Sequence, residues 1–335
     1  MQTRRLFSKQ ALATAALAAG GILPTRAPAA PAVKIVRLAD QPGAEVDYAA
    51  VWIAEALGYF EAEGIKIERH TYANGPAAML DFPNQSIDAV MAAIVPFMQF
   101  AARGGEFKLI MSLTKYNAPL VGPKKYTSYK ELDGKKVGSP GIGTVHDAVL
   151  GYVEETQQIK LQHVFAKITD FAVMIEKDEI EAFIGWEPAS AQAIAQAPQL
   201  LHYVAQRPPM RNAESLSLIF QPKLAKENPD LIVRFLSATL RGIEFIKNNP
   251  QEKTAELIAK KMNNPAAVPV VLTALGSVTL TDPRIDLPST RILLQTIARQ
   301  GKIPPELVTD VDGWIGKYLD YSFLEKAEAS LKQKM

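Results

Sequence analysis

The sequence predicts an α/β protein of two similar lobes, with two chain crossings between them and a helical C-terminal tail. Short β-rich runs alternate with helical periods from Val33 to Val204, which is typical of mostly parallel strands. This alternation breaks at 114–126, where two prolines lie in a stretch of little periodicity, and then restarts. After one more β-rich run at 214–220 the pattern is helical to the end.

The first lobe begins with residues 33–115. Alternation predicts strands at 34–39, 65–69, 88–92 and 108–113. A helix is expected at 47–58, where Ala50, Ile53 and Leu57 share one face, and others at 77–82 and from Pro96.

The second lobe is expected to occupy residues 116–213. Its predicted strands are 135–138, 161–167, 181–186 and 201–204, and its helices are 144–155, 171–177 and one from Pro188. Residues 214–335 then return to the first lobe, with a strand at 214–220 and C-terminal helices, of which 230–247 is the longest. Two lobes that face each other at the carboxyl ends of their strands are expected to hold a ligand in a cleft at the hinge.

The N-terminus has the three parts of an export signal. Basic residues around Arg4-Arg5 precede an apolar run at 11–23, and Ala27-Pro28-Ala29 offers a small-residue cleavage site. The arginine pair with Phe7 and Lys9 is similar to the twin-arginine pattern, so we expect 1–29 to be a signal peptide read by the twin-arginine export machinery. A Sec signal and cleavage after Ala32 remain alternatives, and either route predicts a periplasmic protein.

Composition excludes several classes of protein. The longest apolar run, at 11–23, is shorter than the ~20 residues that a membrane-spanning helix needs. The net charge of the chain is +2, and residues 1–29 carry four positive charges and no negative one. The remaining residues therefore have a net charge of −2 and offer nucleic acid no general attraction. The chain has no cysteine, so it has no disulfide, thiolate metal site or lipid anchor on cysteine. With scattered histidines and no G-x-G-x-x-G after a strand, we expect no metal and no cofactor.

The clearest candidate ligand site is the turn at 139–146, where a strand ends and a helix opens. Its glycines allow close approach, and its unpaired backbone amides would favour an anionic oxygen. The candidate residues there are Ser139, Gly141, Gly143, Thr144 and His146. A plain N-capped turn is the alternative interpretation.

Other candidates lie at neighbouring strand ends and at the crossings. Trp186 and Glu187 follow a strand of the second lobe and would supply an aromatic wall and an acid, although inter-lobe packing and a hinge ion pair are alternatives. The remaining candidates are polar or small residues of the facing loops and of the crossings: Gln41, Tyr48, Asn74, Ala93, Tyr116 and Asn212.

Five stretches together resemble the periplasmic solute-binding proteins of nitrate, sulfonate and taurine ABC importers, which share the NMT1/THI5-like domain with thiamine-pyrimidine synthases. They are Leu57–Ile65, Ser86–Ala89 with Pro96, Leu132–His146, Trp186–Pro188 and Pro222–Pro229. The resemblance implies a type II periplasmic-binding-protein fold. It also implies a monomer that binds a small anionic or zwitterionic solute and delivers it to an ABC permease with a cytoplasmic ATPase.

Three alternatives stay open at this point. The solute could be a thiamine pyrimidine precursor or an aromatic carboxylate, since no arginine lies in the candidate loops. A sensory receptor could replace the importer as the partner. An enzyme is the third alternative, but the related synthases use a cysteine-rich motif with iron and a pyridoxal cofactor, and this chain has no cysteine.

Overall fold

Two five-stranded sheets form the framework of residues 33–334, the part of the chain that the computed structural model describes. Their strand orders are β2-β1-β3-β10-β4 and β7-β6-β8-β5-β9. The strands are β1 (Lys34–Asp40), β2 (Ile65–Thr71), β3 (Ala89–Ala92), β4 (Lys108–Lys115), β5 (Leu120–Pro123), β6 (Lys136–Ser139), β7 (Gln162–Phe165), β8 (Ala182–Ile184), β9 (Leu201–Ala205) and β10 (Glu214–Phe220). The expected signal peptide, 1–29, lies outside the described residues.

The two sheets share one topology. In each sheet the strand that follows a crossing runs antiparallel to both of its neighbours: β10 between β3 and β4, and β5 between β8 and β9. Three neighbouring strands of each sheet pair in parallel: β1 lies between β2 and β3, and β6 lies between β7 and β8. The chain therefore passes from the first sheet to the second between β4 and β5, and returns between β9 and β10.

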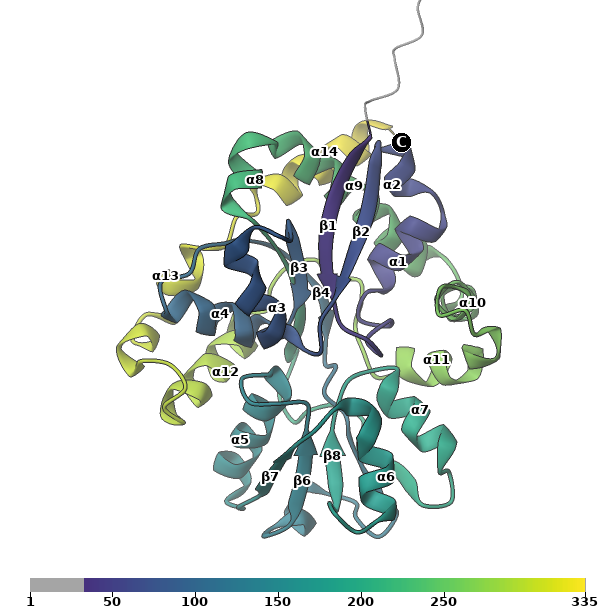
Figure 1. Cartoon of the computed structure of the whole chain (residues 1–335), viewed down its shortest axis with the longest axis vertical. Coiled ribbons are helices and arrows are strands. Elements are labelled where there is room, and N and C mark those ends of the chain that lie inside the picture. The colour runs from purple at the N-terminus through teal and green to yellow at the C-terminus, as the bar shows by residue number, and fades with distance from the viewer. Residues whose placement is uncertain (1–32, 335) are drawn as a thin grey trace, which may run out of the picture. The chain divides into compact units, whose positions relative to one another are not determined.

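Helices flank both sheets and make up most of the chain after β10 (Figure 1). Those between the strands are α1 (Ala49–Ala56), α2 (Tyr59–Ala62), α3 (Gly75–Asp81), α4 (Ile94–Ala102), α5 (Val145–Gln157), α6 (Phe171–Glu176) and α7 (Ala189–Gln196). Those after β10 are α8 (Pro222–Glu227), α9 (Pro229–Asn248), α10 (Gln251–Lys261), α11 (Val268–Leu275), α12 (Leu287–Arg299), α13 (Val311–Gly316) and α14 (Ser322–Lys334). Short 3₁₀ helices lie at Phe82–Asn84, Tyr129–Leu132, Ile168–Asp170, Pro265–Ala267 and Pro305–Val308.

The predicted fold class is confirmed, with one strand missed. No strand was expected within 114–126, yet Leu120–Pro123 forms β5, which pairs with β8 on one side and with β9 on the other. Gly122 and Pro123 are residues that local propensity assigns to turns. Pairing on both sides overrides that propensity, because a buried strand gains hydrogen bonds and packing from two neighbours.

The C-terminal helices contact elements that flank both sheets. The 20-residue helix α9 packs against α1, α2 and α14, while α11 packs against α7 and α12 packs against α5. The described residues belong to one compact unit. Among residues 33–334, every helix is too short or too polar to cross a bilayer.

One element boundary matters for the site. The helix expected from residue 47 begins only at Ala49, so Asp47 and Tyr48 belong to the loop that follows β1. Both side chains are buried nonetheless.

Candidate functional site

A cavity lies between the strand-end loops of the first sheet and those of the second. It encloses about 410 Å³ of space not filled by atoms, part of it open to solvent. Six of the sequence-predicted residues line it: Gln41, Asn74, Ala93, Thr144, His146 and Trp186. Residues that were not predicted complete the wall: Ala44, Asp47, Gly75, Pro76, Pro96, Val145, Asn117, Ser215 and Leu216.

Loops from both sheets meet at the cavity. Asn74 caps the N-terminus of α3, with its Oδ1 accepting from the Ala77 N–H at 3.1 Å, and its Nδ2 donates to the carbonyl of Pro140 at 3.3 Å across the cavity. Gly43 has a φ of +72°, and a side chain there would lie against Ala189 and the Trp186 indole nitrogen. A glycine at this position lets the loop after β1 approach the Trp186 ring.

Several buried polar atoms of the cavity wall have no hydrogen-bond partner within the described residues. They are Asp47 Oδ1, Asn117 Nδ2, His146 Nδ1 and Trp186 Nε1. The exposed fractions of these four residues are at most 6%. Buried polar groups are normally paired, and each one left unpaired costs on the order of 1–3 kcal/mol. Four such atoms around one cavity are typical of a site that is completed by a ligand.

Asp47 dominates the electrostatics of the cavity. Its pKa is raised to about 8: complete burial is the main cause, hydrogen bonds with the Asn117 and Thr114 side chains lower it, and the nearby Glu187 and Glu45 raise it. Neither Lys nor Arg occurs among the residues of the described chain that line the cavity. The wall is therefore acidic rather than basic.

His146 is a neutral hydrogen-bonding group here. Burial lowers the pKa of its imidazole to about 4, so the ring is uncharged at neutral pH. Its Nε2 lies 3.2 Å from the backbone oxygen of Asn117, which can only accept, so Nε2 carries the proton and Nδ1 is an acceptor. The Trp186 ring lies 5.4 Å away, and the two rings form an aromatic side of the cavity.

One amide of the turn at 139–146 is paired within the protein. The Gly143 N–H donates to Asp147 Oδ2 at 3.2 Å. The Thr144 hydroxyl is the N-cap of α5: it accepts from the Asp147 N–H at 3.3 Å and donates to the Gly141 carbonyl at 2.8 Å. Asp147 lies in the first turn of α5, where a carboxylate interacts favourably with the helix dipole.

Asp147 is held in place by two cations. Lys302 Nζ lies 2.5 Å from its Oδ2, and His163 Nδ1 lies 3.0 Å from its Oδ1. Hydrogen bonds to Asp147 and Glu154 raise the pKa of His163 to about 9, so His163 is charged at neutral pH. The Gly143 N–H thus belongs to a network in which Asp147 also binds Lys302 and His163.

The other predicted residues lie outside the cavity wall. Ser139 is the last residue of β6, and Gly141 and Gly143 belong to the turn between β6 and α5. Tyr48 lies beneath Gln41, and its hydroxyl accepts from the Gln41 N–H at 2.8 Å. Glu187 is fully buried. Its carboxylate accepts from Tyr203 Oη, Ser277 Oγ and the Ala191 N–H, so its hydrogen bonds are to the protein.

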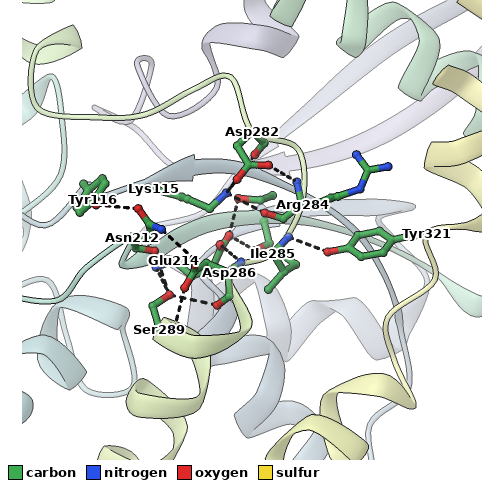
Figure 2. Close-up of polar contacts among 12 residues, drawn as sticks. Lys115, Tyr116, Asn212, Glu214, Asp282, Arg284, Ile285, Asp286, Ser289 and Tyr321 are labelled. Atoms are coloured by element: carbon green, nitrogen blue, oxygen red, sulfur yellow. Dashed lines mark hydrogen bonds and ion pairs between the residues drawn. The ribbon is translucent and has the colours of Figure 1, made fainter.

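Tyr116 and Asn212 lie on the two crossing segments and contact each other. Tyr116 Oη donates to Asn212 Oδ1 at 2.8 Å, and Asn212 Nδ2 donates to Asp286 (Figure 2). Their φ angles are +69° and +51°, which is uncommon for residues other than glycine. Such backbone is found most often at ligand sites and switch regions, and Asn117, the residue after Tyr116, lines the cavity.

A second pocket shares Asn74 and Trp186 with the cavity. It spans about 1120 Å³, much of it open to solvent, and its other lining residues come from the ends of β2 and β7 and from the segments after β1, β2, β6 and β7, with Lys167 as their cation. This outer pocket lies at the same strand-end loops as the cavity.

Sequence reasoning missed Asp47 and Asn117. Asp47 was counted as the first residue of a helix, and Asn117 lay in a stretch without periodicity. A signal existed for Asp47, since a strand end is followed within a few residues by an isolated acid before an apolar helix. The sequence holds no comparable signal for Asn117, which lines the cavity because it lies on the crossing segment between β4 and β5.

The fold and the site together define the class of the protein: two sheets of one topology, two crossings and a cavity between strand-end loops are the periplasmic-binding-protein architecture. The model of the NMT1/THI5-like family matches residues 45–253. The chain belongs to this family. A search of curated proteins finds no match.

Solved structures share this fold at low sequence identity. The alkanesulfonate-binding protein SsuA from Xanthomonas axonopodis pv. citri, bound to MOPS, matches with a TM-score of 0.69 and 12% identity over 82% of this chain and 95% of that one. The periplasmic nitrate-binding protein NrtA from Synechocystis PCC 6803 matches with a TM-score of 0.70 and 14% identity over 89% of each chain. The Candida albicans CA3427 product, described as having the generic periplasmic binding protein fold, matches with a TM-score of 0.64 and 14% identity over 86% of this chain and 97% of that one.

Proposed function

We propose that this chain is the solute-binding component of an ABC importer. It binds a small organic solute in the cavity between the two sheets and delivers it, without chemical change, to a membrane permease with a cytoplasmic ATPase. The observation that carries the proposal is the set of four buried polar atoms without partners around one cavity. The family and the binding proteins that share the fold support it.

The proposed lobes are 33–115 with 214–335, and 116–213. Each contains one sheet, and the solute binds where the strand ends of the two sheets face each other. In this arrangement the crossings beside Tyr116 and Asn212 serve as the hinge, and closing of the lobes buries the solute.

The solute class follows from the wall of the cavity. Sulfonate and nitrate are anions, and a wall without Lys or Arg among the described residues offers them no opposite charge. Of the classes that the sequence leaves open, a zwitterion such as an aminosulfonate or a neutral nitrogen heterocycle fits better than a plain anion.

The proposed place of action is the periplasm, with the chain exported as a monomer through the twin-arginine route. Replacing Arg4 and Arg5 by lysine is expected to leave the protein in the cytoplasm, because that route reads the arginine pair. Unchanged export of the double variant would instead favour a Sec signal.

Native mass spectrometry and thermal shift test the binding function. The protein is purified without denaturation, and a solute retained from the cell is identified by its mass. The same compound, added back to the protein after unfolding, dialysis and refolding, should raise the melting temperature and be recovered unaltered. Conversion of the compound to a product would overturn the proposal in favour of an enzyme.

A further inference from the structure

We propose that the cavity selects its solute by a positively charged nitrogen, which the carboxylate of Asp47 binds. This inference rests on the proposed binding function and names the chemical class of the solute. Asp47 is thereby a specificity-determining residue of the site.

The first argument is the pattern of donors and acceptors. Two of the unpartnered wall atoms are acceptors, Asp47 Oδ1 and His146 Nδ1. The other two, Asn117 Nδ2 and Trp186 Nε1, are donors. The Asn117 side chain lies close enough to Asp47 to lower the pKa of its carboxyl, so the solute adds to that contact: it presents N–H groups to Asp47 and His146 and an acceptor atom to Trp186.

The second argument is the charge around Asp47. Glu45 and Glu187 are the charged groups that act on it, and both are acidic. The cations of the neighbourhood are engaged elsewhere. Lys115 Nζ binds Asp282 and the carbonyls of Asp282 and Arg284, as Figure 2 shows, and Lys302 binds Asp147. Lys167 lines the outer pocket instead of the inner cavity.

The third argument is the cost of an ionised carboxylate at this position. Asp47 is 5% exposed, and a buried charge without an opposite charge is strongly unfavourable. A cationic nitrogen that enters the cavity supplies the missing opposite charge and a hydrogen bond. An anion supplies no opposite charge, so the Asp47 carboxyl would stay protonated beside it.

The aromatic side of the cavity fits the same solute. The rings of Trp186 and His146 lie 5.4 Å apart at an angle of 55°. The face of an indole attracts a cation through its quadrupole, so a flat cationic group could pack beside Trp186 while its N–H groups reach Asp47.

Three compounds of one shape and different charge test the inference: benzamidinium, benzamide and benzoate. Binding to the purified protein is measured by isothermal titration calorimetry at concentrations up to about 10 mM, which detects millimolar dissociation constants. Wild-type protein should bind benzamidinium at least tenfold more tightly than benzamide, and should not bind benzoate.

Two variants locate the effect. Asp47→Asn keeps the shape of the side chain and should abolish the preference for benzamidinium over benzamide. Glu45→Gln changes a neighbouring buried carboxyl by the same single-atom replacement, but Glu45 does not line the cavity, so the preference should persist. A preference that survives in Asp47→Asn overturns the assignment.

The pH profile separates a charge effect from a change of shape. Benzamidinium keeps its charge between pH 6 and pH 8, whereas Asp47 ionises with a pKa of about 8, so affinity should rise roughly tenfold per pH unit in that range. A flat profile overturns the inference.

Failure of the inference and failure of the proposed function can be told apart. If benzoate or an alkanesulfonate binds wild-type and Asp47→Asn protein equally, the charge selection is wrong and solute binding stands. If benzamidinium does not bind at all, the charge selection is also wrong, and the mass of the solute retained from the cell decides the binding function independently.

Discussion

Replacing Asp47 by asparagine should stabilise the protein, and more so as the pH rises. An aspartate has an ordinary pKa near 3.8, and burial raises that of Asp47 to about 8. The folded state therefore holds a proton that the unfolded state releases between these two values. Because the unfolded state then binds fewer protons, the free energy of unfolding falls as the pH rises from about 4 to about 8, and is constant above.

The size of the effect follows from the shift. One pKa unit corresponds to about 1.36 kcal/mol, so Asp47 lowers the free energy of unfolding by on the order of 4 kcal/mol at pH 7 and about 1.5 kcal/mol at pH 5. Asparagine does not titrate. The stability gap between Asp47→Asn and wild type should widen by about 2.5 kcal/mol between pH 5 and pH 7.

Urea unfolding followed by circular dichroism at several pH values measures this gap. The difference between variant and wild type cancels the contributions of other buried acids such as Glu214, whose pKa burial raises to about 7. Glu106→Gln is the matched control, since Glu106 is an exposed acid in the loop before β4 and its replacement should leave the profile unchanged. Parallel curves for wild type and Asp47→Asn would refute the reasoning, because they would mean that Asp47 is ionised in the folded protein at pH 5.

The remaining predictions concern packing, capping, an ion-pair network and the aromatic side of the cavity. Gly242→Ala should lower the free energy of unfolding by about 2–3 kcal/mol in urea titrations, because its Cβ would lie 2.0 Å from the Ala50 carbonyl, whereas Gly316→Ala meets open space and should be neutral. Thr144→Ala removes the N-cap of α5 and should cost about 1 kcal/mol by the same measurement. His163→Gln should destabilise by about 1–2 kcal/mol at pH 6, where the charged ring binds Asp147, and the loss should disappear as the pH rises through about 9, because the stabilisation is lost when the folded-state ring deprotonates. Trp186→Ala should weaken solute binding at least tenfold in calorimetry and, because Trp186 belongs to a buried cluster, should also lower the free energy of unfolding by about 3–5 kcal/mol; unchanged affinity of the folded variant would place the solute elsewhere.

The sequence predicted the elements whose hydrophobic pattern along the chain matches the residues that are buried in the structure. The strand Glu214–Phe220 was predicted with its observed bounds, and α9 to within a residue at each end, because an apolar run and an amphipathic period each leave a regular pattern. The strand Leu120–Pro123 was missed because its stability comes from pairing with β8 and β9, which no window along the chain contains.

The same distinction holds for the site. Gln41, Asn74 and Ala93 line the cavity because they follow strands, and strand order along the chain is readable. The turn alone does not show that the Gly143 amide pairs with the Asp147 carboxylate, which Lys302 binds from more than 150 residues further along. Tertiary contacts decide which amides and charged groups are already paired within the protein. The sequence of the turn alone therefore does not determine the charge of the solute.

The buried polar groups that destabilise the empty cavity are the same groups that we propose bind the solute. A buried acid and unpaired polar atoms lower the stability of the empty protein, a cost that is typical of functional sites. Loops from both sheets meet around these atoms, through Asn74 and Pro140 and through Gly43 and Trp186. A solute that pairs with Asp47 therefore offsets the cost of burying these groups only when the loops of both sheets surround it. The binding energy gained in this way favours the arrangement in which the two sets of loops are in contact, so the residue that selects the solute also couples its presence to closure.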